Sequence, residues 1–493
     1  MQRRLLALAL IVALSGAAAC AAGDSAKSVD GVGQAALTIY HADNDALFSG
    51  DAQGAIDSGR AVVHEQRSID VQSGRHTLRI GGLPASVEPE AVTVNFGNGV
   101  DVLGRRIVLA RGSAGSALSG QIGEHVKVAG SSGQTIAEGE LLGADDNGLT
   151  VRDANGGVIV VHDYAAVSLP ANAVSGGGSV LLDVDAKSSG TREAKLSYST
   201  SGVGWRAAYD ALLASGSACR MHFDPQASIA NRSGRDYDAA TIKLVAGQPN
   251  LANQPPVYGS HIRRMDMAAT AAAPMPKQSS LGDYRTYTLP GAADLPDGTV
   301  TLTPLYASSD LNCTRQYLLE AGNVWQPPKP LLDSNYNNDS YQDQPVASTL
   351  LFEAPDALPA GTLRAKSIDH DGTSELLGEG DIPDTPKGQQ VKVTLGESFN
   401  LRASRERTAF SVDKGAHTMD EAFRITLTNG GDTARTVTVR EHPNRWSAWK
   451  LLSSSIQPDK QTPDTLEFAV NVPVRGKAVL DYRVQYTWLA KDE

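Results

Sequence analysis

The stretch that decides the fold is FRITLTNGGDTARTVTV, residues 423–439. Apolar and polar side chains alternate at residues 423–427 and again at 436–439, on either side of Asn429-Gly430. A period of two puts one face of a strand in a core and the other in water, whereas a helix needs a period near 3.6. An Asn-Gly pair suits the positive-φ conformation of a tight turn. The stretch therefore predicts two β-strands joined by a turn.

The same alternation recurs along the chain, at residues 60–70, 76–80, 92–96 and 241–245. No segment beyond the first twenty residues has the sustained apolar stripe of an amphipathic helix. We therefore expect an all-β protein. Further turn pairs stand between such runs: Asn98-Gly99, Asn147-Gly148, Asn155-Gly156, Asp297-Gly298 and Asp371-Gly372.

A chain of 493 residues is too long for one hydrophobic core, and typical domain sizes suggest about three domains. We expect several β-sandwich-like domains, with one small unit of short, glycine-bent strands that resembles an Sm-like or SH3-like barrel. The stretches 268–280 and 333–344 are poor in aliphatic residues and are expected to be surface loops. The predicted regions are an N-terminal β-domain (35–110), the small barrel-like unit (116–170), a central β-domain with loop insertions (179–400) and an immunoglobulin-like sandwich (401–488).

The N-terminus has the pattern of a secretory signal peptide, residues 1–19. Arg3 and Arg4 precede an apolar run at 5–14, and small residues lead to Cys20. Cys20 stands where a lipoprotein is cleaved and lipidated, although Ala17 replaces the usual leucine of that motif. The same residues also satisfy the rule for simple secretion, so both alternatives stay open. Residues 20–34 are small and polar, as in a flexible tether.

The two remaining cysteines, Cys219 and Cys313, leave two alternatives open. An even pair in an exported chain fits a disulfide, because the compartments outside the cytoplasm are oxidising. Two separate buried thiols are the other alternative.

The net charge of -11 argues against nucleic acid as a partner, because phosphate binding needs a basic surface. It argues equally against adhesion to anionic lipid. A membrane is therefore expected to be reached only through a lipid anchor at Cys20.

Motifs for catalysis are absent from the sequence. It has no G-x-S-x-G elbow, H-E-x-x-H helix, phosphate-binding loop or EF-hand loop. Two groups carry potential metal ligands, but turn or capping roles are the stronger explanation for both: His41, Asp43 and Asp45; and Asp369, His370 and Asp371. We expect no catalytic, cofactor or metal site.

Two aromatic segments are candidates for binding. Tyr336 and Tyr341 flank asparagines and aspartates, which suits contact with a glycan, although a disordered insertion has the same composition. Trp446 and Trp449 suit an anchor for a partner or, alternatively, the closing end of a β-core.

One region resembles a known family. The run LSYSTSGVGWRAAYD at 196–210 is similar to a motif of a bacterial domain-of-unknown-function family whose best-named relatives are the mucoidy inhibitor A proteins. Later segments continue the resemblance over about residues 180 to 488, including those around Asn231, LPAGT at 358–362, and Arg440-Glu441-His442. The relatives carry a coiled coil where this chain has the small β-unit, so nothing that depends on that coiled coil carries over.

The resemblance implies export and a β-rich fold, and it supplies no catalytic residues. Trp205 and Tyr209 are expected to share one face of a strand and fill a core. We expect a non-enzymatic binding or structural protein of the cell envelope, in the periplasm or at the outer membrane. Its partner is expected to be an unknown envelope protein or a glycan. The alternative is a protein that binds or acts on carbohydrate such as exopolysaccharide.

Overall fold

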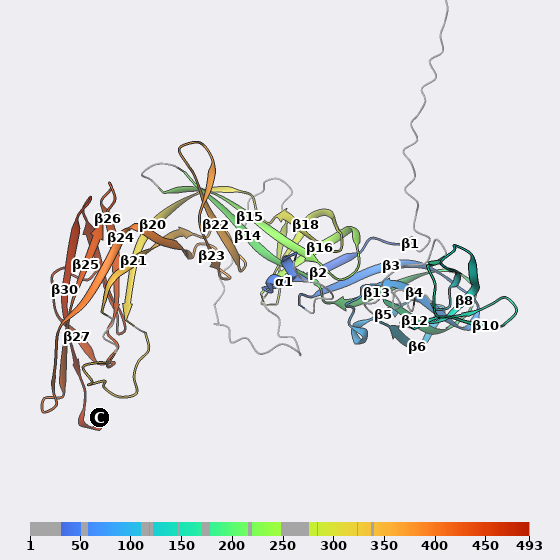
Figure 1. Ribbon diagram of the computed structural model, residues 1–493, viewed down its shortest axis with the longest axis horizontal. Helices are drawn as coiled ribbons and strands as arrows, with labels where there is room; N and C mark the ends of the chain where they lie inside the picture. The colour runs from blue at the N-terminus through green and yellow to red at the C-terminus, as the bar shows by residue number, and fades with distance from the viewer. Residues whose placement is uncertain are drawn as a thin grey trace, which may run out of the picture. The chain divides into compact units, whose positions relative to one another are not determined.

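Nearly every element of the structure is a β-strand (Figure 1), which confirms the all-β prediction. The helices whose bounds lie within the described residues are α1 (Asp45–Phe48) and the 3-10 turns η1 (Pro89–Ala91) and η2 (Ala490–Asp492). None of these is long enough to cross a membrane. The computed structural model describes residues 31–50, 58–109, 118, 122–145, 147–169, 178–214, 219–247, 276–282, 284–322, 324–336 and 340–492.

The chain divides into two compact units. Unit 1 takes its described residues from 1–35, 64–83 and 93–197, and unit 2 from 36–63, 84–92 and 198–493. The limits predicted for the individual domains from sequence stay predictions.

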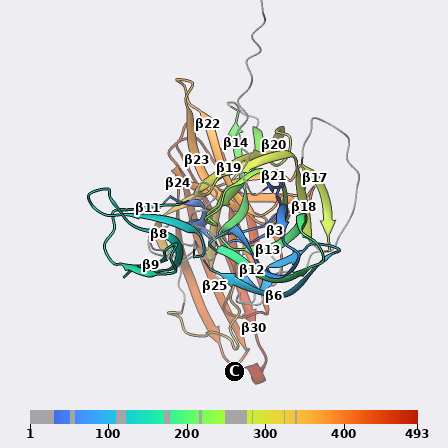
Figure 2. The same cartoon turned by 90° about the vertical axis from the view of Figure 1, so that its right-hand side faces the viewer.

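Unit 1 contains a five-stranded antiparallel sheet with the order β10-β9-β8-β7-β11. It has its own small core, in which Val126, Leu141 and Val151 are fully buried. Figure 2 shows β8, β9 and β11 grouped together in teal. The strands are β7 (His125–Ala129), β8 (Thr135–Asp145), β9 (Gly148–Arg152), β10 (Val158–Val161) and β11 (Ala166–Ser168).

Two further groups of strands lie wholly or mostly in unit 1. In one, β12 (Gly178–Ala186) lies between β4 (Gly74–Leu83) and β6 (Val100–Val108). In the other, the order is β1-β3-β13-β5. Its bounds are β1 (Gly31–Val32), β3 (Ala61–Val71), β13 (Gly190–Thr200) and β5 (Thr93–Asn95).

Unit 2 begins with two groups of strands around the family motif. One has the order β17-β18-β16-β2, and the other has β14 paired with β15 and β22. Their bounds are β2 (Ala36–Tyr40), β14 (Val203–Leu213), β15 (Arg220–Asn231), β16 (Tyr237–Ala246), β17 (Lys277–Leu281), β18 (Tyr284–Leu295), β19 (Thr299–Pro304), β22 (Gly361–Ile368) and β23 (Ser374–Ile382).

The last strands of unit 2 pack face to face around one apolar cluster. Ile425 and Val484 contribute to it from one layer, and Val439 and Phe468 from the other. The bounds are β20 (Ser309–Gly322), β21 (Tyr341–Glu353), β24 (Gln390–Asp413), β25 (Thr418–Asn429), β26 (Arg435–His442), β27 (Trp449–Ser454), β28 (Lys460–Gln461), β29 (Leu466–Val472) and β30 (Lys477–Thr487).

One pairing pattern occurs twice in unit 2. In repeat A (β14, β15, β16, β18 and β19), β15 pairs with β14 and β19, while β16 pairs with β18 and, in parallel, with β2. In repeat B (β24, β25, β26, β29 and β30), β25 pairs with β24 and β30, while β26 pairs with β29 and, in parallel, with β20. The registers agree, because Val203 faces Asn231 in repeat A as Leu401 faces Asn429 in repeat B.

Three of the six predicted turn pairs connect strands that pair with each other. Asn147-Gly148 joins β8 to β9, Asn155-Gly156 joins β9 to β10, and Asp371-Gly372 joins β22 to β23. The other three are not hairpin turns, because the strands on their two sides pair with different partners. These are Asn98-Gly99, Asp297-Gly298 and Asn429-Gly430.

The two stretches predicted as surface loops are partly ordered strands, so that prediction is wrong for part of each. Residues 277–281 form β17, which pairs along β18. Residues 341–344 begin β21, and residues 333–336 form a turn. Residues 268–275 and 337–339 lie outside the described residues.

Candidate functional site

The aromatic residues of the family-like run lie in a core, as predicted. Trp205 and Tyr209 are buried on one face of β14. The Trp205 indole Nε1 donates to the Val245 carbonyl at 3.0 Å, and the Tyr209 hydroxyl donates to the Pro359 carbonyl at 2.6 Å. Tyr209 also stacks on Phe223, with ring centroids 5.4 Å apart. Both polar tips are therefore satisfied within the fold.

Asn231 closes the turn that ends β15. Its Nδ2 donates to the carbonyls of Arg235 and Leu295, at 2.8 and 2.7 Å, and its Oδ1 accepts from Ser233. Asn429 does the same at the end of β25, where Nδ2 donates to the carbonyls of Thr433 and Pro473. Both side-chain amides are buried, and both their nitrogen and oxygen atoms are hydrogen-bonded within the fold, which indicates a structural role for both asparagines.

The glycine of the LPAGT segment, Gly361, is required by the close approach of two strands. It pairs with Ala207 where β22 runs parallel to β14, and a Cβ on Gly361 would meet the Ala207 carbonyl oxygen at 2.1 Å. Only glycine allows this approach of the two backbones.

His41 and its neighbours are used in local contacts. The His41 Nε2 lies 3.1 Å from the Ala360 carbonyl and 3.3 Å from the Asp43 carboxylate, and Asp45 pairs with Arg206 at 2.6 Å. Asn44 caps α1 through its side chain. The structure brings His41 and Asp43 together and directs Asp45 to Arg206.

The segment Asp369-His370-Asp371 forms the exposed tip of the β22–β23 hairpin. A hydrogen bond from His370 lowers the pKa of the Asp369 carboxyl, and one from Thr373 lowers the pKa of Asp371. Within the described ranges, no group of three or more His, Cys, Asp or Glu side chains is arranged to hold a metal ion.

Cys219 and Cys313 form a disulfide, with their Cα atoms 5.0 Å apart. Cys313 is the residue at which β20 stops pairing with β15 and starts pairing with β21. The bridge therefore fastens β20 where it passes from one group of strands to the next. Cys20 lies outside the described residues.

The tyrosines considered for glycan contact are not open platforms. Tyr336 is half-buried beneath the Arg445 guanidinium, 5.8 Å from its ring centroid, and Tyr341 packs against the apolar cluster of repeat B. Asn337, Asn338 and Asp339 lie outside the described residues.

Trp446 and Trp449 also pack against the apolar cluster of repeat B, and the Trp449 indole donates to the Pro463 carbonyl at 2.7 Å. The carbohydrate alternative stays a prediction without a contact to support it.

Sequence reasoning missed the most distinctive polar group of the chain, a set of charged side chains buried in repeat B. Arg405 donates to both oxygens of Glu441, at 3.0 and 2.9 Å, and lies over the ring of Phe423. Both charged side chains are almost fully buried, at 4% and 1% exposed. Tyr482 donates to Glu441 at 2.7 Å.

These contacts shift the pKa values of the group. Burial alone would lower the pKa of Arg405, but Glu441 and Tyr482 raise it above the usual value. Burial, then the charge of Glu441, raises the pKa of Tyr482 far above that of a free phenol. Arg405 and Tyr482 therefore both stay protonated throughout the physiological range.

Arg445 anchors a neighbouring segment to the same group. Its Nε donates to Glu421 at 2.9 Å, and its terminal nitrogens donate to the carbonyls of Leu331, Asp333 and Tyr336, at 2.7–3.0 Å. Arg407 approaches the same Glu421 oxygen at 3.5 Å. Arg445 thus holds the turn at 331–336 against repeat B.

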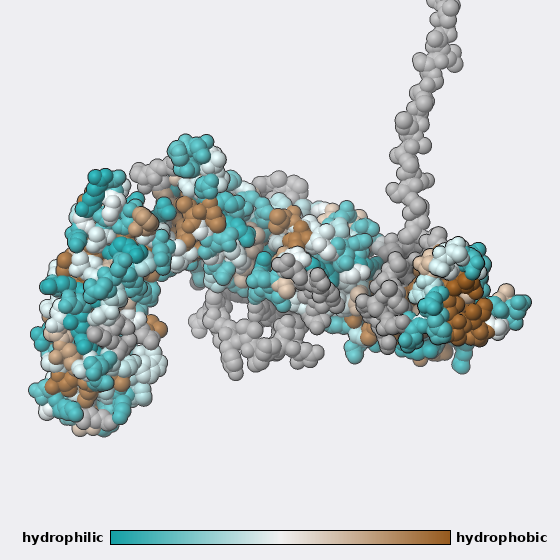
Figure 3. Space-filling view, viewed as in Figure 1, coloured by the Kyte–Doolittle hydropathy of each residue, from teal (hydrophilic) through white to brown (hydrophobic). Residues whose placement is uncertain are grey.

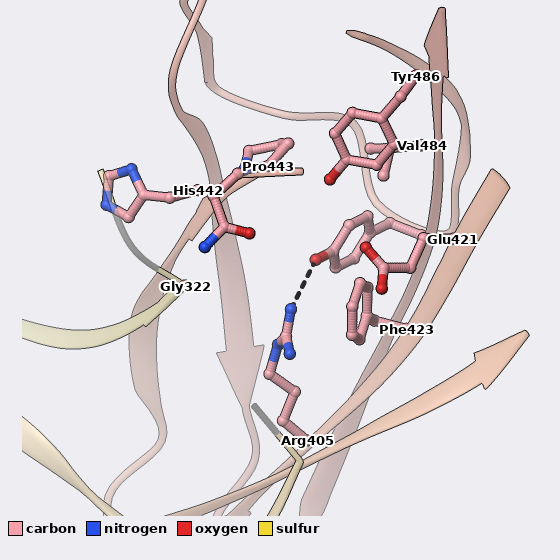
Figure 4. Close-up of a pocket in the computed structure, with 10 residues that line it drawn as sticks. Gly322, Arg405, Glu421, Phe423, His442, Pro443, Val484 and Tyr486 are labelled. Atoms are coloured by element: carbon pink, nitrogen blue, oxygen red, sulfur yellow. Dashed lines mark hydrogen bonds between the residues drawn. The ribbon is translucent and has the colours of Figure 1, made fainter. Parts of the chain in front are cut away.

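A small pocket opens beside these side chains (Figure 4). Arg405 points into it toward a tyrosine hydroxyl, Glu421 and Tyr486 lie on the facing side, and the His442 ring points away. The space suffices for about one water molecule. Asn444 also lines the pocket, and its buried Nδ2 has no hydrogen-bond partner within the described part of the chain.

His442 itself is engaged on both ring nitrogens. Nδ1 lies 2.9 Å from the Asp464 carbonyl, and Nε2 lies 3.1 Å from the Glu320 carboxylate. It therefore links β26 to β20 and to the loop before β29, rather than facing the pocket.

A signal for this group exists in the sequence. The inward positions of β25 are Met419, Glu421, Phe423, Ile425 and Leu427, so one carboxylate interrupts an apolar face. Charged residues at core positions are rare unless they are paired.

Comparison with known proteins places most of unit 2 in one family. A family model described as a domain of unknown function, DUF4139, matches residues 194–488. No curated protein matches the sequence. The matched region contains both repeats, the disulfide and the buried charged group. Since it spans more than half of the chain, this protein belongs to the DUF4139 family.

Proposed function

We propose that this protein is an exported, non-enzymatic component of the cell envelope that binds another envelope protein by strand addition. The buried charged groups support a non-enzymatic role, because they are occupied with one another or with backbone carbonyls. The pocket beside them is too small for a substrate.

The observation that carries the binding proposal is the edge strand β10. It pairs only with β9 among the described strands, and its outward side chains Val158 and Val160 are 58% and 57% exposed. Figure 3 shows an apolar patch over β8 and β10. The strand carries no charge, proline or bulge, the features by which proteins usually protect a sheet edge.

Such an edge suits an extended segment with apolar side chains at alternate positions. The outer backbone groups of β10, which pair with no other described strand, would supply hydrogen bonds. Val158 and Val160 would contact every second side chain of the added strand. A second copy of this chain is less suited, because pairing two four-residue strands buries far less area than a stable dimer needs. The partner is therefore a longer segment of another protein.

Export is supported by the disulfide between Cys219 and Cys313, since such bonds persist in oxidising compartments. We place the mature protein in the periplasm or at the outer membrane, anchored through a lipid on Cys20.

The proposal also covers the fold type of two regions and the relation to a named family. We take the five-stranded sheet of unit 1 to be an Sm-like or SH3-like barrel, and residues 401–488 to be an immunoglobulin-like sandwich. We take the mucoidy inhibitor A proteins to be relatives, on the motif at 196–210.

Photo-crosslinking in living cells tests the binding proposal. A photoreactive residue at position 160 is expected to attach to an extended apolar segment of one partner, identified by mass spectrometry of the joined peptides. Val158→Lys on the same chain should abolish the adduct. Ser168→Lys, on the opposite edge of the same sheet, should leave it.

Two outcomes would overturn the proposal. An adduct between two copies, with a dimer in solution, would make β10 a self-association edge. Turnover of a glycan, peptide or ester by the purified protein, lost in Glu421→Gln while the fold is retained, would make the protein an enzyme.

A further inference from the structure

The charged side chains on the five-stranded sheet of unit 1 are partly matched with one another. The carboxylates opposed by a basic side chain are Glu140, by Arg152 at 2.8 Å; Glu138, by Lys127 at 3.5 Å; and Glu124, by Arg79 of β4. These pairs use both of the Lys and Arg side chains that the described part of this sheet contains. Any further carboxylate on the sheet therefore leaves a net negative charge.

Three such carboxylates remain, and they lie at the two ends of the edge strand β10. Asp163 follows the last residue of β10, Val161, by two positions. Asp145 ends β8, where Gly148 packs against the Val161 carbonyl. Asp153 begins the turn that leads into β10 at its other end. Asp145 and Asp153 accept backbone N–H groups of their own turns, and none of the three forms an ion pair with another described residue.

We propose that the segment that adds to β10 is basic, with Lys or Arg on both sides of a short apolar stretch. This inference rests on strand addition at β10 and specifies the chemistry of the partner. The exposed side chains of Val158 and Val160 contact the apolar stretch, and the aspartates beyond the two ends of β10 attract its flanks. Charge pairs of this exposed kind add modestly to affinity, but they select between partners and accelerate association.

The same charges act against a second copy of this chain. In an antiparallel pair of β10 strands, the start of each strand lies beside the end of the other. Asp163 of one copy would therefore approach Asp153 of the other, and like charges repel. A basic segment of another protein meets attraction at both ends instead.

Binding of labelled peptides to the full mature chain, measured by fluorescence anisotropy, tests the proposal. Three peptides share the stretch Thr-Val-Thr-Val-Thr and carry two lysines, two serines or two glutamates at each end. At low salt the lysine peptide is expected to bind roughly 10-fold more tightly than the serine peptide, and the glutamate peptide is expected to bind weakest. High salt should bring the three affinities together, because it screens exposed charges.

Two matched variants locate the charges responsible. Asp163→Asn should lower the preference for lysine over serine by about 2- to 5-fold, because it removes the charge at one end of β10. Asp101→Asn makes the same chemical change at an exposed position of β6, in a different sheet, and should leave the preference unchanged.

Val158→Lys separates this inference from strand addition itself, because it should abolish binding of all three peptides. Equal binding of the three peptides to the wild type, lost in Val158→Lys, would overturn the basic partner and leave strand addition standing. Binding that survives Val158→Lys, or no binding of any peptide, would refute strand addition and this inference with it. In cells, the segment crosslinked to position 160 should carry basic flanks, and acidic or uncharged flanks would overturn the inference.

Discussion

The pair Arg405–Glu441 illustrates how much a single buried contact contributes in this protein. Glu441→Gln leaves the Arg405 charge without its counter-ion in a site that is almost closed to water. We expect the free energy of unfolding to fall by about 3–5 kcal/mol, measured by urea denaturation.

A matched control is the exposed pair Arg424–Asp481 on the outer face of the same sheet. Asp481→Asn should leave the unfolding curve unchanged, because water screens that pair. Equal losses in the two variants would contradict the importance of burial.

Tyr287 gives a pH dependence with a definite sign. Burial, the largest cause, raises its pKa to about 12, whereas an unfolded tyrosine ionises near pH 10. Its contribution to stability is therefore complete below pH 10 and is lost as the pH rises toward 12. Stability measured between pH 9 and 11 should fall, and Tyr287→Phe should reduce the slope. Reversible ionisation of all 14 tyrosines near pH 10 in the folded protein, followed by absorbance, would contradict this.

At the scale of the strand, the sequence predicts where strands occur better than it predicts which strands pair with each other. Alternation located β3, β4, β16, β25 and β26, because the period of two depends only on which face is buried. The turn pairs did not reveal partners: Asn147-Gly148 closes a hairpin, whereas Asn429-Gly430 passes between layers. Both Asn-Gly pairs suit the same local turn conformation. Which strands pair on either side of the turn is decided by residues far away in the sequence.

The charged site was beyond sequence reasoning for a related reason. Arg405, Glu421, Glu441 and Arg445 come from three strands and a loop, and no local spacing joins them. Trp205 and Tyr209, by contrast, lie on one strand, so their shared face was predictable.

Gly361 sets the approach of β22 to β14, and it gives an element-scale prediction. Gly361→Ala forces a Cβ against the Ala207 carbonyl and should lower the unfolding free energy by about 1–3 kcal/mol. Gly291→Ala in β18 is the control, because its Cβ meets nothing within 4 Å. Thermal unfolding should show a loss for the first variant and none for the second, and equal midpoints would refute the steric argument.

At the scale of the molecule, the disulfide constrains a long loop. It joins residues separated by 94 positions, so removing it should cost about 2–5 kcal/mol. The double variant Cys219→Ser/Cys313→Ser should unfold at lower urea than the oxidised wild type. Wild-type protein treated with a reductant should match the variant. A variant as stable as the oxidised protein would show that the bridge contributes nothing.

The export prediction concerns the whole chain and is checked on its mature end. Mass spectrometry of the protein from its native host should find Cys20 as the first residue, carrying a diacylglyceryl group. Cys20→Ala should release the protein from the membrane fraction. An unmodified Cys20, or a start beyond it, would show simple secretion instead.

The division of β20 between two groups of strands shows what the disulfide joins. Its first residues bond to β15 and its later residues to β21 and β26, with Cys313 at the change. The sulfur bridge, being covalent, keeps β20 joined to the start of β15 even where the hydrogen bonds between the two strands break.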